Sequence, residues 1–419
     1  MGELGEEKER RTTGELKKEV RERILQGLTY QRQMADEEIE ELIDQEILAC
    51  TAGEPLFLEE RLRLQKELFD SFRRLDILQE LVDDPAITDI MVNGPDHIFV
   101  ESGGVMRKWE KSFESREQLL DLIRQIVSSV NRIVNTSVPV ADARLADGSR
   151  AHVVLEPIAL EGPVLTIRKF PEPITMERLL EYGSISEEAA KLLKTLVAAR
   201  YNIFVSGGTG AGKTTFLNAL SEFIPRDERV ITIEDSAELK LRHIENLVRL
   251  ETREANAQGE GAIGMGALIR AALRMRPSRI LIGEVRGKEA LDLLQAMNTG
   301  HDGSFSTGHA NSPKDMLSRL ETMVLMAADL PLPAIRSQIA SAVDIMVHVA
   351  RMRDRTRKVV AIEEVDRYED GEIILNPLFA FRERGKGGER DPGGKVDGCL
   401  EQVGTCRHKE KLRMAGYTV

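Results

Sequence analysis

The chain has 419 residues, of which 42% are hydrophobic and 31% charged, and at about 150 residues per domain this length predicts two or three domains. A net charge of −12 and an aromatic content of only 4% argue against a general nucleic-acid binder, which needs basic surface and aromatic stacking platforms. Three cysteines, at positions 50, 399 and 406, are too few for a disulfide scaffold and lack the C-x-x-C spacing of a zinc ribbon.

The N-terminal segment predicts a helical arm. The first residues contain no apolar signal sequence, and no run of about 18 apolar residues occurs in the chain, so we expect a soluble, cytoplasmic protein with reduced cysteines. Residues 1–53 are rich in Glu, Arg and Lys, and their apolar positions recur at helical spacing. The pattern predicts an acidic helical arm, for which solvated helices are favoured over a partner-binding role.

Residues 54–170 are predicted to form one compact α+β domain. Helical patterns at 56–81 and 117–133 alternate with short β-like runs, and turn signals such as Asn93-Gly94-Pro95 separate them. The β-like runs lie at 89–92, 97–100, 152–155 and 164–167. Residues 171–175 then form a short stiff linker, because two prolines restrict the backbone there.

Residues 176–381 alternate strand and helix patterns, which is typical of an α/β domain with a largely parallel sheet. The strand candidates are 201–206, 229–233, 279–285 and 304–307, and the helix candidates are 268–275, 289–297 and 312–327. Beyond residue 381 the chain becomes rich in glycine and charge. Residues 382–419 are therefore predicted to be a flexible linker and C-terminal tail, to which we assign no role.

A phosphate-binding loop follows the first strand of the α/β domain. Residues 207–214 fit G-x-x-x-x-G-K-[ST] throughout, between an apolar strand and a predicted helix. The glycines let backbone N–H groups point at a phosphate, Lys213 reaches the β- and γ-phosphates, and the Thr214 hydroxyl can bind Mg²⁺. The sequence thus predicts binding of a nucleoside triphosphate. The candidate nucleotide-binding residues are Gly207, Gly208, Thr209, Gly210, Ala211, Gly212, Lys213, Thr214 and Thr215.

Acidic residues end two further predicted strands. Glu284 follows the strand at 280–282, where a carboxylate can orient or deprotonate a water beside the γ-phosphate. An ion pair with Arg286 is the alternative for Glu284. Glu234 and Asp235 end another strand, and Mg²⁺ would offset their crowded charge. An acidic cluster that starts a helix is the alternative for that pair.

Histidines and arginines supply further candidates. His301 and His309 lie in a Gly-, Ser- and Thr-rich segment where they are placed to sense a phosphate, and no third ligand stands at zinc spacing. Guanidinium groups suit phosphate oxygens. Each arginine alone suits a surface ion pair, but we expect at least two of the set to contact nucleotide. The candidate arginines are Arg249 and Arg253 in the α/β domain and Arg144, Arg150 and Arg168 in the α+β domain.

Together these stretches resemble the ATPases of type II and type IV secretion and type IV pili. Within that superfamily the sequence is most similar to the CpaF/TadA ATPases of tight-adherence (Flp) pilus systems. The stretches that carry the resemblance are 90–95, 142–150, 165–170, 207–214, 231–235 (the Asp box), 248–253, 283–287 and 297–313 (the His box). They span residues 54 to 381, and the tetracysteine zinc site of many pilus-assembly ATPases is absent.

The resemblance implies a homohexameric ring with a RecA-like C-terminal motor preceded by a smaller α+β domain. It implies that Glu284 is the catalytic Walker B glutamate, that Glu234 and Asp235 help to hold Mg²⁺, and that His309 contacts the γ-phosphate of ATP. The ring would dock on inner-membrane platform proteins at the cytoplasmic face of the membrane and couple ATP hydrolysis to pilin extraction.

Three alternatives remain at this point. A VirB11-like type IV secretion or conjugation ATPase has the same motor chemistry, and partners would select its cargo. A hexameric nucleic-acid translocase shares the RecA-like core, although the acidic charge counts against it and no nucleic-acid partner is expected. A small-molecule kinase or a GTPase lacks support, since the chain has no Asn-Lys-x-Asp guanine-reading motif and no visible acceptor pocket.

Overall fold

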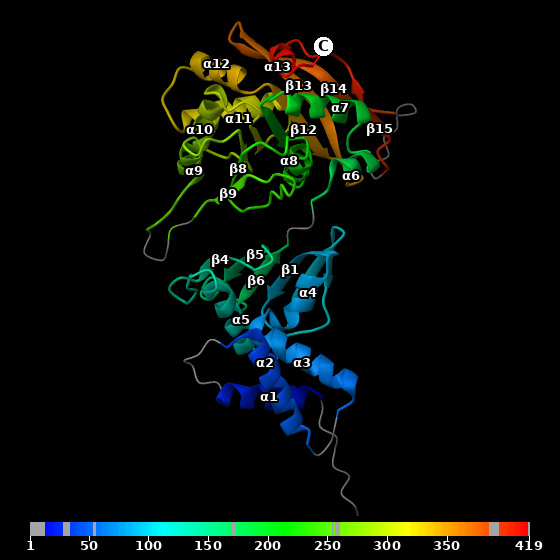
Figure 1. Cartoon of the computed structure of the whole chain (residues 1–419), viewed down its shortest axis with the longest axis vertical. Helices are drawn as coiled ribbons and strands as arrows, with labels where there is room; N and C mark the ends of the chain where they lie inside the picture. Colours follow the sequence, from blue (N-terminus) through cyan, green and yellow to red (C-terminus); the bar gives the residue numbers. More distant parts are fainter. Residues whose placement is uncertain are drawn as a thin grey trace, which may run out of the picture. The chain divides into compact units, whose positions relative to one another are not determined.

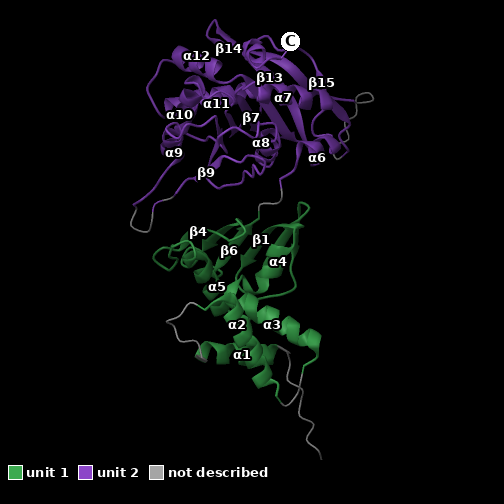
Figure 2. Cartoon of the chain, viewed as in Figure 1, with its two compact units in different colours: residues 1–171 green, residues 172–419 purple. Residues whose placement is uncertain are grey.

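The computed structural model describes residues 13–27, 34–52, 56–169, 173–253, 255, 260–384 and 394–417. The chain divides into two compact units, Met1–Pro171 and Glu172–Val419 (Figure 2). Each unit has its own sheet and its own hydrophobic core. Among the described residues, none of the helices combines the length and apolar character needed to cross a membrane.

Unit 1 begins with three helices that share a small apolar core. They are α1 (Thr13–Gly27), α2 (Asp36–Cys50) and α3 (Leu58–Arg73). Buried isoleucines of α2 recur every four residues, and Leu64 and Leu68 of α3 are buried in the same cluster. The sequence pattern predicts residues 58–73 within the α+β domain, whereas in the structure α3 packs against α1 and α2 (Figure 1).

The rest of unit 1 is a six-stranded antiparallel sheet with short helices. The strand order is β3-β2-β1-β6-β5-β4. The elements are η1 (Asp76–Leu78), α4 (Gln79–Asp83), β1 (Ile87–Asn93), β2 (Ile98–Ser102), β3 (Val105–Lys108), α5 (Arg116–Ser128), β4 (Val140–Arg144), β5 (Arg150–Val154) and β6 (Val164–Arg168). The amphipathic helix α5 packs its apolar face into the core of this sheet.

Unit 2 contains a nine-stranded sheet in the order β15-β14-β13-β12-β7-β11-β10-β8-β9. The six strands from β12 to β9 run parallel, and β13, β14 and β15 extend the sheet antiparallel. The strands are β7 (Ile203–Gly207), β8 (Val230–Glu234), β9 (Leu247–Glu251), β10 (Arg279–Ile282), β11 (Phe305–His309), β12 (Ile345–Arg351), β13 (Arg357–Glu369), β14 (Glu372–Glu383) and β15 (Gly398–Gln402). The predicted α/β fold with a parallel core is confirmed.

Helices cover both faces of this sheet (Figure 1), so its central strands are buried throughout. One core includes residues of α6 (Met176–Glu181), α7 (Glu187–Ala198), α8 (Lys213–Ser221) and α13 (Glu410–Met414). The other core includes residues of α9 (Met265–Ala272), α10 (Glu289–Asn298), α11 (Pro313–Leu325) and α12 (Leu332–Ala342). Ser312 caps α11 by accepting a hydrogen bond from the backbone of Asp315 at 3.0 Å, as the Ser-Pro start signal predicts.

From residue 394 the C-terminal segment differs from the expected flexible tail, whereas residues 385–393 of the predicted linker lie outside the described residues. Residues 394–417 include β15, which pairs with β14, and the short helix α13. Lys411 of α13 forms ion pairs of 2.7 Å with both Asp302 and Asp344, and the buried Glu364 carboxylate accepts the backbone N–H groups of Arg407 and His408. These contacts are distant in sequence, which is why the local glycine-rich composition misrepresented the segment.

Candidate functional site

The P-loop connects the buried strand β7 to helix α8, in the setting that the motif requires. Gly207 lies so close to β12 that a Cβ atom there would sit 2.4 Å from the carbonyl oxygen of Val349. Gly210 and Gly212 adopt positive φ angles of 70° and 92°, which other residues rarely adopt. Each of these three positions therefore requires glycine for its own steric reason, and together the glycines allow the loop to wrap a phosphate.

Lys213 is buried at the start of α8, with its ammonium group facing the end of β11. Its Nζ atom donates to the carbonyl oxygen of Gly208 at 3.2 Å and to Nδ1 of His309 at 3.1 Å. Burial lowers the pKa of Lys213, while the nearby Glu284 carboxylate opposes that shift. A cation held in this way lacks a full anionic partner, which suits it to the charge of a polyphosphate.

His309 ends β11 and lies between Lys213 and Glu284. Its pKa is below the usual value because of burial and then of the Lys213 charge. A neutral ring that accepts from Lys213 through Nδ1 carries its proton on Nε2, and Nε2 lies 3.2 Å from Oε1 of Glu284. A neutral ring forms no ion pair with this carboxylate, and Oε1 is buried without a hydrogen-bond partner among the described residues.

Glu284 follows β10, and Oε2 of its carboxylate accepts a hydrogen bond from Arg286 at 3.1 Å. The Arg286 ion pair that the sequence left as an alternative is thus present, together with the contact to His309. Because Oε1 has no partner, it can accept a hydrogen bond from a water molecule.

Glu234 ends β8 beside this carboxylate and is only 2% exposed. Its Oε1 atom accepts the backbone N–H groups of Glu238 and Leu239 at 3.0 Å each, and burial raises its pKa to about 7. Gly283 allows this packing, since a Cβ atom there would lie 3.0 Å from Cγ of Glu234. Asp235, next in sequence, is exposed and accepts from the Thr252 hydroxyl at 3.3 Å.

One carboxylate oxygen at this edge of the sheet could accept a divalent cation. Oε2 of Glu234 is buried and has no hydrogen-bond partner within the described part of the chain. A buried carboxylate oxygen without a partner is costly, and a hard cation would satisfy it. The hydroxyl of Thr214 and the carboxylate of Asp235 are the other oxygen donors that the sequence predicts here, and all three side chains are of the type that Mg²⁺ prefers.

The remaining predicted residues of unit 2 divide into two groups. Arg249 lies on β9 and donates to the carbonyl oxygen of Ala237, in the loop that follows Glu234. Arg253 follows β9, the edge strand of the sheet, and donates to the carbonyl oxygen of Gly261 at 2.7 Å. His301 precedes β11, whereas His309 ends it. Because a five-residue strand spans about 17 Å, the two histidines lie at opposite ends of the sheet.

The three arginines of unit 1 form one row across adjacent strands. Arg144 on β4 is paired with Arg150 on β5, and Arg150 is paired with Arg168 on β6. Arg150 also donates to Asp142 at 3.1 Å. Like charges directly opposite one another destabilise a sheet, and the Asp142 carboxylate offsets part of that cost at Arg150.

Sequence reasoning missed Arg357, at the start of β13. Its Nε atom donates to the carbonyl oxygen of Gly210 in the P-loop at 2.9 Å. The alternating arginines of residues 351–357 were the available signal, but nothing local in the sequence connects them to a loop about 147 residues away.

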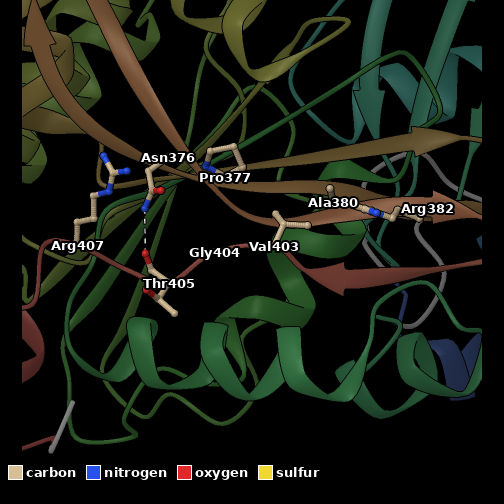
Figure 3. Close-up of a pocket in the computed structure, with 8 residues that line it drawn as sticks. All are labelled: Asn376, Pro377, Ala380, Arg382, Val403, Gly404, Thr405 and Arg407. Atoms are coloured by element: carbon tan, nitrogen blue, oxygen red, sulfur yellow. Dashed lines mark hydrogen bonds between the residues drawn. The ribbon is translucent and has the colours of Figure 1, made fainter.

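A groove of about 610 Å³ lies elsewhere in unit 2, between β14 and the C-terminal segment (Figure 3). Its wall is tied together by Asn376, whose amide donates to the carbonyl oxygen of Thr405 at 3.0 Å. None of the predicted site residues lines it. The lining residues are Asn376, Pro377, Ala380, Arg382, Val403, Gly404, Thr405 and Arg407.

Known proteins are similar to this chain over most of its length. A family model described as type II/IV secretion system protein matches residues 73–385. A putative conjugal transfer protein of Mycobacterium tuberculosis is 38% identical over 293 residues, which cover 68% of this chain and 83% of that protein. The type IV secretion system protein VirB11 of Brucella suis is 33% identical over 305 residues, covering 66% of this chain and 84% of VirB11. The X-ray structure of the Legionella pneumophila ATPase DotB superposes with a TM-score of 0.50 at 19% identity, covering 69% of this chain and 80% of DotB.

Proposed function

Because the chain belongs to the type II/IV secretion system protein family, we propose that its ATP hydrolysis powers a motor of a tight-adherence (Flp) pilus system. One observation carries the mechanism. Lys213, His309 and Glu284 come from three different elements, and they meet at the carboxyl ends of the parallel strands, where α/β sheets bind their ligands.

In this proposal the P-loop binds ATP, and Lys213 moves its hydrogen bonds from Gly208 and His309 to the β- and γ-phosphate oxygens. Glu284 accepts a proton from a water through Oε1 as that water attacks the γ-phosphorus. The bond between the γ-phosphorus and the bridging oxygen breaks, and ADP and phosphate are the products. His309 contacts the γ-phosphate and thereby makes the position of Glu284 depend on whether that phosphate is present.

Thr214, Glu234 and Asp235 would hold Mg²⁺, which supplies charge neutralisation to the phosphates when it is bound. Glu234 would do so through Oε2, since its Oε1 is already committed to two backbone N–H groups. Deprotonation of Glu234 would accompany cation binding, because its pKa of about 7 leaves it partly protonated near neutral pH.

The arginine row of unit 1 supplies the remaining positive charge in this proposal. Arg144, Arg150 and Arg168 would contact nucleotide phosphates, which removes the cost of placing three guanidinium groups side by side. Arg249 would contribute through its position next to Glu234, and Arg253 and His301 would act only after a rearrangement or from another subunit.

The working form would be a homohexamer that docks on inner-membrane platform proteins at the cytoplasmic face of the membrane. The sequence resemblance to CpaF/TadA ATPases supports pilin as the cargo. A VirB11-like secretion or conjugation ATPase is the second candidate, and the similarity to a putative conjugal transfer protein and to VirB11 supports it.

A deletion strain complemented with wild type or Glu284→Gln distinguishes the two candidates. We expect loss of sheared surface pili with normal plasmid transfer, and restoration by wild type alone. Loss of DNA transfer or of effector secretion, with pili intact, would favour the second candidate. The Glu284→Gln arm shows whether either phenotype depends on hydrolysis.

A further inference from the structure

The hairpin between β12 and β13 places a run of basic residues beside the P-loop. β12 is the neighbour of β7 on the side opposite β11, and its Val349 touches Gly207. Residues 351–358 carry four arginines and one lysine, in a chain whose net charge is −12. A concentrated positive charge at this place is complementary to a polyphosphate.

Arg357 is the member of this run that reaches the loop. Its Nε atom donates to the carbonyl oxygen of Gly210 at 2.9 Å, and its Cδ atom would lie 3.2 Å from a Cβ atom built on Gly212. The side chain thus lies along the loop while remaining exposed. Within the part of the chain that the structure describes, its two Nη atoms have no hydrogen-bond partner, so four N–H donors are available there.

The hairpin holds Arg357 without neutralising it. The Asp354 carboxylate accepts the hydroxyl and backbone N–H of Thr356 and the backbone N–H of Val396, and these bonds lower its pKa to about 2. This carboxylate is therefore committed to the turn. Arg353 is bonded to Glu383, and among the described residues neither acid forms an ion pair with Arg357.

The contact with Gly210 also orients a peptide group of the loop. The peptide between Gly210 and Ala211 is planar and trans, so fixing its carbonyl on one side directs the N–H of Ala211 to the other side. The N–H of Ala211 donates to the carbonyl oxygen of Gly208 at 3.3 Å, inside the turn of the loop. Arg357 therefore stands on the outer side of that turn.

The order of the strands decides which phosphates Arg357 can reach. The Glu284 carboxylate and His309 lie on the β10 and β11 side of β7, and the proposed water attack on the γ-phosphate takes place there. Arg357 approaches from the β12 side. It lies across β7 from Glu284 and His309, a position that favours contact with the α- and β-phosphates over the reacting γ-phosphate.

We propose that Arg357 binds the α- and β-phosphate oxygens of nucleoside di- and triphosphates through its Nη atoms, while its Nε atom stays on Gly210. This inference rests on the proposed nucleotide site and adds a residue to it. The interaction is made equally with ADP and ATP, so it strengthens binding of both without lowering the barrier of the chemical step.

The test measures ADP and ATP affinity and turnover for Arg357→Ala, Arg357→Gln and the matched control Arg355→Ala. Arg355 belongs to the same hairpin, is exposed and makes no hydrogen bond to the P-loop in the described structure. We expect Arg357→Ala to lower the affinities for ADP and ATP by the same factor of about ten, which is the size of effect expected when a charge-assisted hydrogen bond is lost. Its kcat should stay within two-fold of wild type. Arg355→Ala should bind both nucleotides as wild type does.

Arg357→Gln separates phosphate binding from support of the loop. Glutamine can still donate to the carbonyl of Gly210 but carries no charge. We expect it to bind ADP as weakly as Arg357→Ala. Wild-type affinity in either variant would overturn the proposal, and so would an equal loss in Arg355→Ala. Failure of wild type to bind ATP would instead overturn the proposed function, so the two failures are distinguishable.

Discussion

The Nε2 atom of His309 lies 3.2 Å from the Oε1 atom of Glu284, and this contact joins the carboxyl ends of β11 and β10. His309 also accepts a hydrogen bond from Lys213, which reaches the γ-phosphate in this motif. The His309 ring therefore connects Lys213 to Glu284, the proposed base. Arrival of a phosphate at Lys213 would release His309 from one of its two partners. The contact thus offers a physical route by which a phosphate bound at Lys213 affects the position of Glu284.

His309→Ala tests this route. We expect kcat to fall by about 10- to 100-fold, because the γ-phosphate contact and the positioning of Glu284 are both lost. ADP affinity should change by less than about three-fold, since the P-loop and Lys213 remain. Steady-state ATPase rates and ADP titrations measure the two quantities. An unchanged kcat would remove His309 from the mechanism.

His348 provides a prediction for the pH dependence of stability. It is buried on β12, hydrogen-bonds with the Ser206 hydroxyl at 2.9 Å, and burial lowers its pKa. The unfolded chain then binds a proton more readily than the folded chain, so this residue's contribution is present above the usual histidine pKa of about 6.5 and is lost as pH falls through the lowered value.

We therefore expect His348→Asn to lose less stability than wild type between pH 7.5 and 5.5. Denaturant midpoints at the two pH values measure this difference. Other groups that titrate in this range are common to both proteins, so the comparison isolates His348. A wild-type pH dependence in the variant would contradict the prediction.

Lys411 should anchor the C-terminal segment. Its ammonium group lies 2.7 Å from Asp344, whose pKa is raised by burial. Lys411→Ala leaves that carboxylate buried without its cation, and we expect a loss of about 2–3 kcal/mol in the free energy of unfolding, below the range for fully buried pairs because the lysine is partly exposed. Adding Asp344→Asn should recover part of the loss. Denaturant unfolding of wild type, Lys411→Ala and the double variant checks both statements. If Lys411→Ala is as stable as wild type, the segment is held by packing alone.

Arg168→Ala should separate stability from activity. The residue is exposed and directly opposite Arg150, so its removal relieves like-charge repulsion and should leave the melting temperature unchanged or slightly higher. If Arg168 contacts nucleotide as proposed, ATP turnover falls at least ten-fold in the same protein. Thermal melting and ATPase assays on one preparation give both readouts. Normal turnover would exclude this arginine from the motor.

The sequence predicted well what is encoded locally. The P-loop, Glu284 and Glu234 each sit at the end of an apolar run, and such runs are recognisable because both faces of a central parallel strand are buried. The strand β4 was missed because its buried positions are the small residues Ala141 and Ala143, which give little hydrophobic signal. The strand β3 was missed because all four of its residues are exposed.

Features that depend on distant contacts were not predictable. Arg357 acquires its place only because β12 pairs with β7, and β15 exists only because β14 offers it an edge. The two histidines had similar surroundings in sequence, yet β11 separates them because they lie on either side of it. Local composition indicates which secondary structure a segment favours. The end of a sheet at which a side chain lies depends instead on how the strands are connected and paired.

ATP turnover of wild type and Glu284→Gln, measured together with particle mass with and without ATP, decides whether the protein is a ring-shaped motor whose base is Glu284. We expect turnover in a ring-sized species and a loss of at least about 100-fold in the variant, with ATP binding retained because the P-loop is intact. A monomer in which Glu284→Gln turns over ATP as fast as wild type would contradict both the assigned base and the proposed motor.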